Sequence, residues 1–176
     1  KKMIVKTEQE LRNPTRPFDF KKDDLQSMKL EMINTMWLES GLGISANQCG
    51  YESRMFCMRA ETKTDSLVCI NPRIIEFSEN MNTMEEGCLS IPDVFARVVR
   101  PSEVSVTWTN ELNEEEKERL DGLTARVFQH ELDHLEGILF IDRIKPFARK
   151  RAFDKAKKIQ KMRGRGKEKY KARFAL

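Results

Sequence analysis

The sequence lacks the features that would place it in a membrane or outside the cell. It has no apolar run approaching the roughly 18 residues that a membrane span needs. Its first residues, KKMIVKTEQELRNP, are basic, but no apolar stretch follows them, so we expect no signal peptide. None of its four cysteines forms a C-x-x-C pair, and their spacing does not suggest a disulfide framework. These absences favour a protein of the reducing cytoplasm, where a thiol stays free or binds a metal.

Histidine is scarce: the chain has only His130 and His134, both within the stretch QHELDHLEG. Residues four apart on a helix lie about 40° apart around the axis, so both imidazoles point the same way and can reach one metal ion. Glu131 lies beside them, where a carboxylate can take a proton from a metal-bound water. The alternative is a pair of surface histidines on an amphipathic helix. The apolar residues around them predict a buried helix instead, and a buried His-Glu-His cluster is unfavourable unless something satisfies it.

Charge is distributed unevenly along the 176 residues. Residues 145–176 hold 14 basic and 2 acidic side chains, a net charge of +12. Residues 1–144 hold 18 basic and 26 acidic side chains, a net charge of −8. A basic tail on an acidic body suggests a polyanionic partner for the tail.

The order of periodic segments predicts an α+β fold. Strand patterns precede one central helix, so we expect a single domain with antiparallel strands around that helix, followed by a C-terminal helix. The Met-rich stripe of the first helix predicts core packing rather than a metal or cofactor site. The expected elements are a helix over 22–40, strands over 54–60, 66–72 (ended by Pro72), 73–77 and 104–110, a helix from about Asp121 to a stop at Gly137, an extended piece over 138–144, a helix opening at Pro146 with an apolar stripe from Phe147 to Ile159, and a flexible basic extension beyond Met162.

A metal site with one open position needs a third protein ligand. The pattern H-E-x-x-H-x-x-G-x-x-H of one zinc peptidase class is followed as far as Gly137, but its last position is Phe140. Other zinc peptidases use a downstream glutamate, and that region offers only Asp154 amid positive charge. The third ligand is therefore a cysteine or an upstream acid. Cys88 differs from the other cysteines because it lies in MEEGCLSIP, where the backbone is expected to bend, although a packed thiol remains the alternative reading.

Three segments resemble, in order and spacing, the signature motifs of peptide deformylase. They are GLGISANQ (41–48), EGCLS (86–90) and QHELDH (129–134), and the likeness extends over most of the chain. Three motifs in order are far more specific than an isolated H-E-x-x-H. One departure is Ser45, where the family usually has alanine, and we expect it to affect packing beside the pocket more than the chemistry.

The resemblance implies a metal-dependent hydrolase that removes the formyl group from the N-terminal formyl-methionine of nascent chains. It makes residues 1–144 the catalytic domain and residues 145–176 a basic helix and extension of it. It implies Cys88, His130 and His134 as metal ligands and Glu131 as general base. The side-chain amide of Gln48 and the backbone N–H of Leu89 would stabilise the oxyanion. The implied substrate-binding residues are Gly43, Ile44, Met84, Glu86, Gly87, Leu123 and Val127, with the backbone of Ile44 and Gly87 pairing with the peptide.

The resemblance also bears on cofactor and partners. It favours Fe²⁺ as the native ion, and a Cys-His-His set also suits Zn²⁺, Ni²⁺ or Co²⁺. We expect formyl-methionyl peptides as substrates, docking on the ribosome near the peptide exit through the basic tail, no DNA or membrane partner, and a monomer. Two other hypotheses remain: a zinc peptidase cleaving internal peptide bonds, and a non-enzymatic ribosome-binding or RNA-binding protein with this fold.

Overall fold

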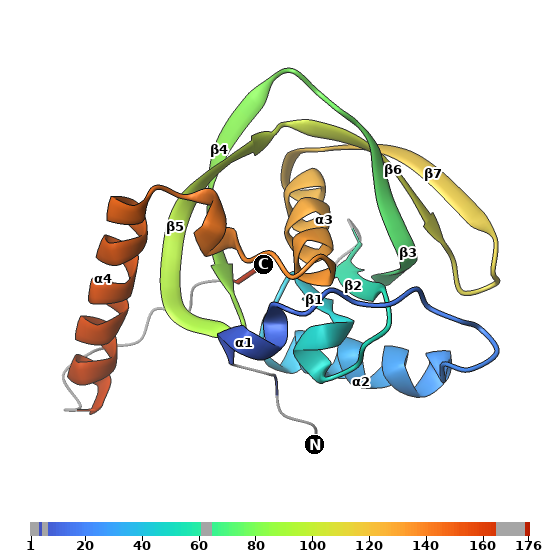
Figure 1. The fold of residues 1–176 in the computed structure, drawn as a ribbon, viewed down its shortest axis with the longest axis horizontal. Coiled ribbons are helices and arrows are strands. Elements are labelled where there is room, and N and C mark those ends of the chain that lie inside the picture. The colour runs from blue at the N-terminus through green and yellow to red at the C-terminus, as the bar shows by residue number, and fades with distance from the viewer. Residues whose placement is uncertain (1–3, 5–6, 61–64, 165–174) are drawn as a thin grey trace.

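The computed structural model describes residues 4, 7–60, 65–164 and 175–176. Strands arch around one central helix, α3, and a separate helix, α4, lies outside them (Figure 1). The strands form a five-stranded antiparallel sheet of order β1-β2-β3-β6-β7 and a two-stranded antiparallel sheet, β4-β5. The expected α+β class is confirmed. The bounds are α1 Glu8–Leu11, α2 Leu25–Leu38, β1 Gly43–Ser45, η1 Ala46–Cys49, β2 Met55–Arg59, β3 Ser66–Phe77, β4 Met81–Cys88, β5 Ile91–Pro101, β6 Glu103–Thr109, β7 Glu115–Asp121, α3 Gly122–Leu135, η2 Phe140–Arg143 and α4 Pro146–Gly164, where η denotes a 3₁₀ helix.

Strand β6 follows the alternation that its sequence predicts. Val104, Val106 and Trp108 are all buried on one face. They pack against α3, where the Phe128 ring lies 6.4 Å from the Trp108 ring and 5.0 Å from the Phe56 ring of β2. One face of the sheet and one side of α3 thus form the main core.

Strand β3 is longer than expected, because Pro72 does not end it. The ladder between β3 and β6 shifts register between Ile70 and Arg73, so the proline lies at an irregularity where no ladder hydrogen bond is required of it. Asn71 adopts the left-handed region (φ 49°), and its side-chain amide exchanges hydrogen bonds of 2.8 and 3.2 Å with the backbone of Phe18. This side chain stabilises the bulge.

Four strands, β1, β4, β5 and β7, were not predicted from the sequence, and β5 and β7 show the reason. β7 reads EEKERLD, and its charged side chains suit its position as the outermost strand of the five-stranded sheet. β5 gains its strand conformation by pairing with β4 from Met81↔Pro101 to Cys88↔Ile91. Both are strands because of pairing, and an isolated stretch of sequence does not reveal pairing.

Helix α2 buries its methionine stripe. Met28, Met32 and Met36 pack with Ile44 of β1 and with Ile70, so the interpretation of the stripe as core is confirmed. The helix begins at Leu25 because the Asp24 side chain accepts a hydrogen bond from the Ser27 backbone. This packing covers the face of β1 opposite to α3.

The segment after α3 differs from its prediction in one respect. α3 ends before Gly137, whose positive φ (74°) supplies the expected stop. Residues 138–144 were expected to be extended, but Phe140–Arg143 form the 3₁₀ helix η2. The turn is favoured because the Asp142 carboxylate accepts a 2.9 Å hydrogen bond from the Leu139 backbone. A carboxylate placed three residues on can close such a turn whatever the strand propensity of its neighbours.

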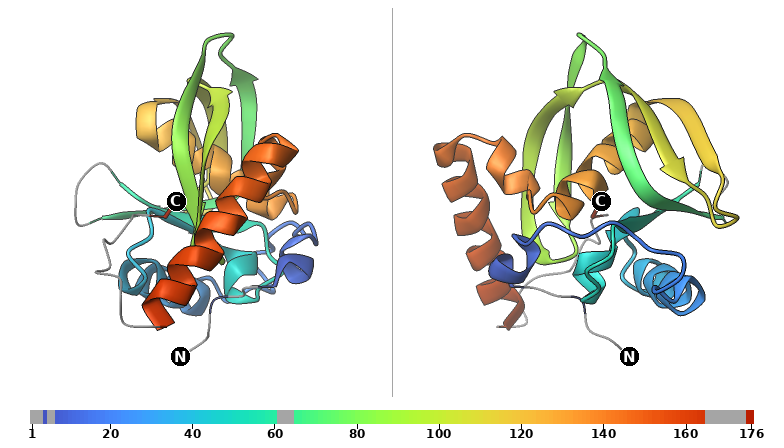
Figure 2. Two further views of the ribbon diagram at one scale, coloured as in Figure 1. Left: turned by 90° about the vertical axis from the view of Figure 1, so that its left-hand side faces the viewer. Right: turned by 45° about the vertical axis from the view of Figure 1, so that its right-hand side comes forward.

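Helix α4 opens at Pro146 as predicted and lies alongside β5 (Figure 2). Ala152 and Ala156 face Val94 and Val98 of β5, but Phe147 is 72% exposed, so the expected apolar stripe does not include it. The helix continues past Met162 to Gly164, and residues 165–174 of the expected extension lie outside the described residues. Within the part of the chain that the structure describes, no helix has the length and apolar character to cross a membrane.

Candidate metal centre

The end of β4 and the middle of α3 bring three ligand-bearing side chains together. The Cys88 sulfur and one nitrogen each from His130 and His134 lie within 4.8 Å of one another, and all three residues are buried. Cys88 Sγ lies 3.3 Å from His134 Nε2. The helical spacing sets the two imidazoles 4.9 Å apart, and the β4 backbone carries the thiol to them from 42 residues earlier in the chain.

Glu86 fixes the orientation of one imidazole. Its carboxylate lies 2.8 Å from His130 Nδ1, which leaves His130 Nε2 on the side of the cluster. Among the described residues, that Nε2 is buried without a hydrogen-bond partner. One thiol and two imidazoles, with an unsatisfied ring nitrogen and an anchored ring, are a donor set that fits a divalent transition metal.

The side chain of Glu86, which was expected at the substrate pocket, pairs with buried arginines. The carboxylate is fully buried and accepts hydrogen bonds from Arg100 (2.7 and 2.9 Å) and Arg126 (2.8 Å). Burial alone would raise the pKa of Glu86, but hydrogen bonds from Arg100 and His130 outweigh it and hold that pKa well below its ordinary range. The carboxylate therefore serves as the counter-ion of two buried guanidinium groups.

Asp133 extends the same network, and sequence reasoning missed it together with both arginines. Its carboxylate accepts a 2.7 Å hydrogen bond from Arg100 and hydrogen bonds of 2.5 and 2.6 Å from Arg143. A signal was present in the sequence: Arg100 follows two valines, and Arg126 and Asp133 lie on the helix that was expected to be buried. A charged residue in an apolar stretch of sequence predicts that it has an oppositely charged partner, but it does not show which residue that partner is.

Glu131 is the buried carboxyl beside the histidines. Among the described residues, neither of its oxygens has a hydrogen-bond partner. Burial, reinforced by the Glu86 carboxylate, raises the pKa of Glu131 well above its ordinary value. The side chain fits only because Gly43 has no side chain, since a Cβ there would lie 2.5 Å from Glu131 Oε1. A carboxyl that holds a proton readily thus faces the backbone of β1.

Burial also sets the protonation of two of the three ligand-bearing residues. It lowers the pKa of His134, with the neighbouring His130 adding to the effect, so this imidazole is neutral as a metal ligand requires. Burial raises the pKa of the Cys88 thiol to about 12, against an opposing hydrogen bond from the Ser90 backbone. A metal ion that binds this thiol displaces its proton, so we expect metal affinity to depend on pH.

The side-chain amide of Gln48 points toward Cys88. Its Oε1 accepts hydrogen bonds from the Ser45 backbone (2.9 Å) and the Ser45 hydroxyl (3.0 Å). Its Nε2 lies 3.1 Å from Ser90 Oγ and 3.5 Å from Cys88 Sγ. The serine that departs from the usual motif thus holds Gln48 by its hydroxyl, in addition to packing there. Leu89 is half-buried in the turn that follows Cys88.

Comparison with known proteins decides the family. The family described as "Polypeptide deformylase" matches residues 1–150 of the 176. The chain belongs to the polypeptide deformylase family. It is 39% identical to "Peptide deformylase 2" of Prochlorococcus marinus over 137 residues, covering 76% of this chain and 68% of that protein. It is 35% identical to a peptide deformylase of Rhizorhabdus wittichii over 161 residues, covering 87% of this chain and 91% of that one. The crystal structure of a peptide deformylase from Legionella pneumophila superposes with a TM-score of 0.83 at 30% identity, covering 94% and 98% of the two chains.

Deformylases are metal-dependent hydrolases that remove the formyl group from the N-terminal methionine of nascent polypeptides, and this chain is one of them. The expected family, fold and reaction are therefore confirmed. The reading as a peptidase that cleaves internal bonds and the reading as a non-enzymatic homologue have no support in these comparisons.

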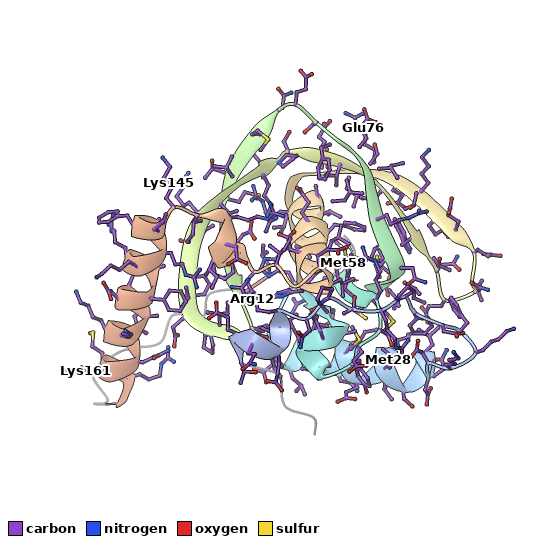
Figure 3. All side chains as sticks on the ribbon, in the orientation of Figure 1. Arg12, Met28, Met58, Glu76, Lys145 and Lys161 are labelled. Atoms are coloured by element: carbon purple, nitrogen blue, oxygen red, sulfur yellow. The ribbon has the colours of Figure 1, made fainter. Side chains whose placement is uncertain are left out.

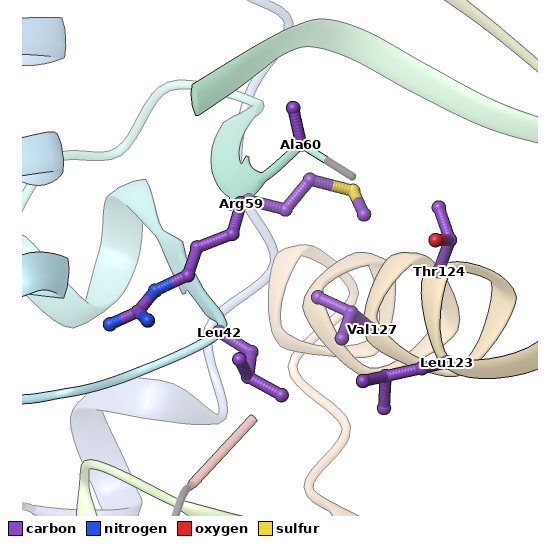
Figure 4. A pocket seen from close by; sticks show the side chains of 7 residues that line it. Leu42, Arg59, Ala60, Leu123, Thr124 and Val127 are labelled. Carbon is purple, nitrogen blue, oxygen red and sulfur yellow. The ribbon is translucent and has the colours of Figure 1, made fainter. Parts of the chain in front are cut away.

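The deformylase chain has an apolar cavity of about 600 Å³ between Leu42, β2 and α3. Leu123 and Val127 of α3 line it, and Leu42 faces them from just before β1 (Figure 4). The remaining lining residues are Met58, Arg59, Ala60 and Thr124.

The side chain of Ile44, which was expected in the substrate pocket, does not line this cavity. Ile44 is fully buried on the opposite face of β1, under α2. Successive side chains of a strand point to opposite faces, so Gly43 faces Glu131 while Ile44 faces the methionine stripe. Leu42 precedes the strand, and its side chain lines the cavity. Met84 is half-buried on β4, opposite Val98.

Proposed function

We propose that Cys88, His130 and His134 hold one divalent metal ion, and that this deformylase hydrolyses N-formyl-methionyl peptides there with Glu131 as proton carrier. The convergence of the three ligand atoms within 4.8 Å, beside a buried carboxyl, carries this proposal. When bound, the metal supplies a Lewis acid that activates water near neutral pH. We propose Fe²⁺ as the native ion from the family resemblance, and the donor set also suits Zn²⁺, Ni²⁺ and Co²⁺.

The residues of the chain divide the remaining work. Glu131 takes the proton of the attacking water and returns it to the leaving amine, a role that suits a carboxyl whose pKa is raised by burial. The Gln48 amide and the Leu89 backbone N–H donate to the oxygen that becomes negative on the formyl group. Leu123 and Val127 bind the methionine side chain in the apolar cavity. The geometry of Gln48, held by Ser45 with its amide nitrogen turned toward Cys88, supports this division.

Two substitutions test the proposal separately. Cys88→Ala removes one of three ligands, so metal analysis of the purified protein is expected to show most of the metal lost. Glu131→Gln keeps the metal, and formate release from formyl-Met-Ala-Ser is expected to fall by at least a hundredfold. Glu118→Gln, an exposed carboxylate on β7, is the matched control with unchanged activity. Metal content unchanged in Cys88→Ala would refute the ligand set. Activity of Glu131→Gln within about threefold of wild type, roughly 0.65 kcal/mol in the barrier, would refute the proton-transfer role.

We also propose that residues 1–144 carry out catalysis and that residues 145–176 dock the deformylase on ribosomal RNA near the peptide exit. Residues 145–164 hold nine basic side chains and one acidic side chain. Their charged groups extend into solvent on α4, between Lys145 and Lys161 in Figure 3, while the alanines face β5. The polarity of this helix supports docking to a polyanion. We further propose a monomer in the cytoplasm, where the Cys88 thiol stays reduced.

Charge reversal in α4 tests the docking without changing a residue of the metal centre or of the apolar cavity. Lys157→Glu with Lys161→Glu is expected to weaken co-sedimentation with ribosomes and to flatten its dependence on salt. Activity on a free formyl tripeptide is expected to stay unchanged. Lys117→Glu, exposed on β7, is the matched control and is expected to pellet like wild type. Equal pelleting of all three proteins at low and high salt would end the docking proposal.

A further inference from the structure

The last two residues of the sequence are buried in the middle of the molecule. Ala175 and Leu176 are 8% and 4% exposed, although the sequence around them was expected to be a flexible basic extension. The end marked C in Figure 1 lies centrally, beside α3 and the β4-β5 sheet. Burial of two apolar residues at this position requires a cleft that accepts them.

Backbone hydrogen bonds hold these two residues on both sides. The Leu42 N–H donates to the Ala175 carbonyl at 3.0 Å, and the Leu176 N–H donates to the Gly87 carbonyl at 3.1 Å. β1 is the outermost strand of its sheet among the described residues, so the chain beside it has backbone groups free to pair. The dipeptide thus bridges Leu42, just before β1, and the end of β4 in the manner of an added strand.

The apolar contacts of Leu176 point to the same cleft. Its side chain belongs to the apolar cluster that includes Val127 and Met58, with Leu42 packed against it. These three residues also line the 600 Å³ cavity beside α3. Figure 4 shows the C-terminal segment beside Leu42 at the edge of this cavity. A leucine suits this position, because its volume is close to that of the methionine side chain proposed to bind beside Val127.

The dipeptide occupies one of the two backbone positions that were expected to pair with the substrate. Gly87 precedes the ligand Cys88, and its backbone was expected to pair with the peptide being deformylated. The Leu42 N–H and the Gly87 carbonyl, each engaged by the dipeptide, are not free to pair with a second strand in the same place. Occupation by the chain itself and by a peptide are therefore mutually exclusive.

We propose that Ala175–Leu176 is an internal ligand of the peptide cleft and competes with N-formyl-methionyl peptides, so that the enzyme restrains its own activity until the segment is displaced. This inference rests on the proposed function only for the identity of the competing peptide. Competition of this kind raises the apparent KM and leaves kcat unchanged, because the displaced enzyme is chemically intact.

Kinetics on the metal-loaded full chain test the competition. Leu176→Asp and deletion of residues 175–176 are each expected to lower KM for formyl-Met-Ala-Ser at least threefold with kcat unchanged. Leu112→Asp, which changes a leucine that is 77% exposed in the β6–β7 turn, is the matched control and is expected to leave both constants unchanged. A free peptide Arg-Phe-Ala-Leu is expected to inhibit the deletion variant competitively, and Arg-Phe-Ala-Asp is not. A KM that is unchanged or raised in both Leu176→Asp and the deletion would overturn the proposal.

A second measurement does not depend on catalysis. The Leu42 amide is expected to exchange its hydrogen slowly in wild type and much faster in the deletion variant, because its acceptor is Ala175. Labelled Met-Ala-Ser is expected to bind the deletion variant more tightly than wild type. Absence of deformylation in every protein, with faster exchange and tighter binding in the deletion variant, would refute the proposed function and leave this inference standing. Equal exchange at Leu42 in both proteins would overturn this inference alone.

Discussion

Arg100→Met breaks the buried ion network beneath the metal centre and gives a demanding test of its energetics. Arg100 is nearly fully buried and donates two hydrogen bonds to Glu86 and one to Asp133. Methionine keeps most of the volume and removes the charge. Glu86 then loses one of its two guanidinium partners, while Asp133 keeps only Arg143.

The expected loss follows from what remains. Removing one partner of a buried ion pair costs about 3–5 kcal/mol, since the other charge stays buried without compensation. Glu86 keeps Arg126 and His130, so we expect the lower end, about 3 kcal/mol in the free energy of unfolding. For a chain of this size that loss lowers the midpoint of thermal unfolding by roughly 6–12 °C. Glu86, which anchors His130, is itself held less firmly without Arg100, so metal affinity is expected to fall about tenfold, the lower end for outer-shell partners.

Urea unfolding of the metal-free proteins measures the first effect, and competition with a chelator measures the second. Arg119→Met is the matched control, because Arg119 pairs with Glu103 on the surface and its loss is expected to leave the unfolding midpoint unchanged. The reasoning is refuted if Arg100→Met is destabilised by less than about 1 kcal/mol, or if it unfolds together with the control.

Three further predictions concern single groups. Gly43→Ala is expected to reduce deformylation at least tenfold with the metal retained, because a Cβ there would lie 2.5 Å from Glu131. Gly164→Ala is the control, since Gly164 has open space around it. Equal activity of the two variants would contradict the close approach of Gly43 to Glu131. Arg16 donates hydrogen bonds to the Asp23 carboxylate and holds the pKa of Asp23 well below its ordinary value, despite burial. This carboxylate therefore stabilises the fold above about pH 4, and its contribution is lost as the pH falls. Asp23→Asn is therefore expected to unfold with a weaker acid dependence than wild type in urea titrations from pH 6 to 2, and parallel curves would count against it. Removing the metal with a chelator is expected to lower the thermal midpoint of wild type and to leave that of Cys88→Ala unchanged, since only the folded state binds the ion; an equal drop in both would place the metal elsewhere.

The sequence alone determined the features that depend on neighbours along the chain. Helical spacing put His130 and His134 on one face, and α3 carries them as expected. The alternation in β6 and the methionine stripe of α2 each predicted which side chains are buried. The three ordered motifs were sufficient to indicate the family. Such signals are local because a helix or strand repeats its geometry every few residues.

Only the tertiary structure decided which side chains meet across the chain. It paired Glu86 with Arg100 and Arg126. These partners lie far from Glu86 in sequence, so the spacing of residues along the chain does not predict the ion pairs. It also set which residues around β1 face the cavity: Ile44 packs under α2, whereas Leu42, which precedes the strand, lines the cavity. β7 is a strand because β6 offers it an edge, despite its charged sequence. Leu176 is buried for the same reason, because Leu42 and Gly87 offer backbone groups, and Met58 and Val127 an apolar surface, to a segment remote in sequence.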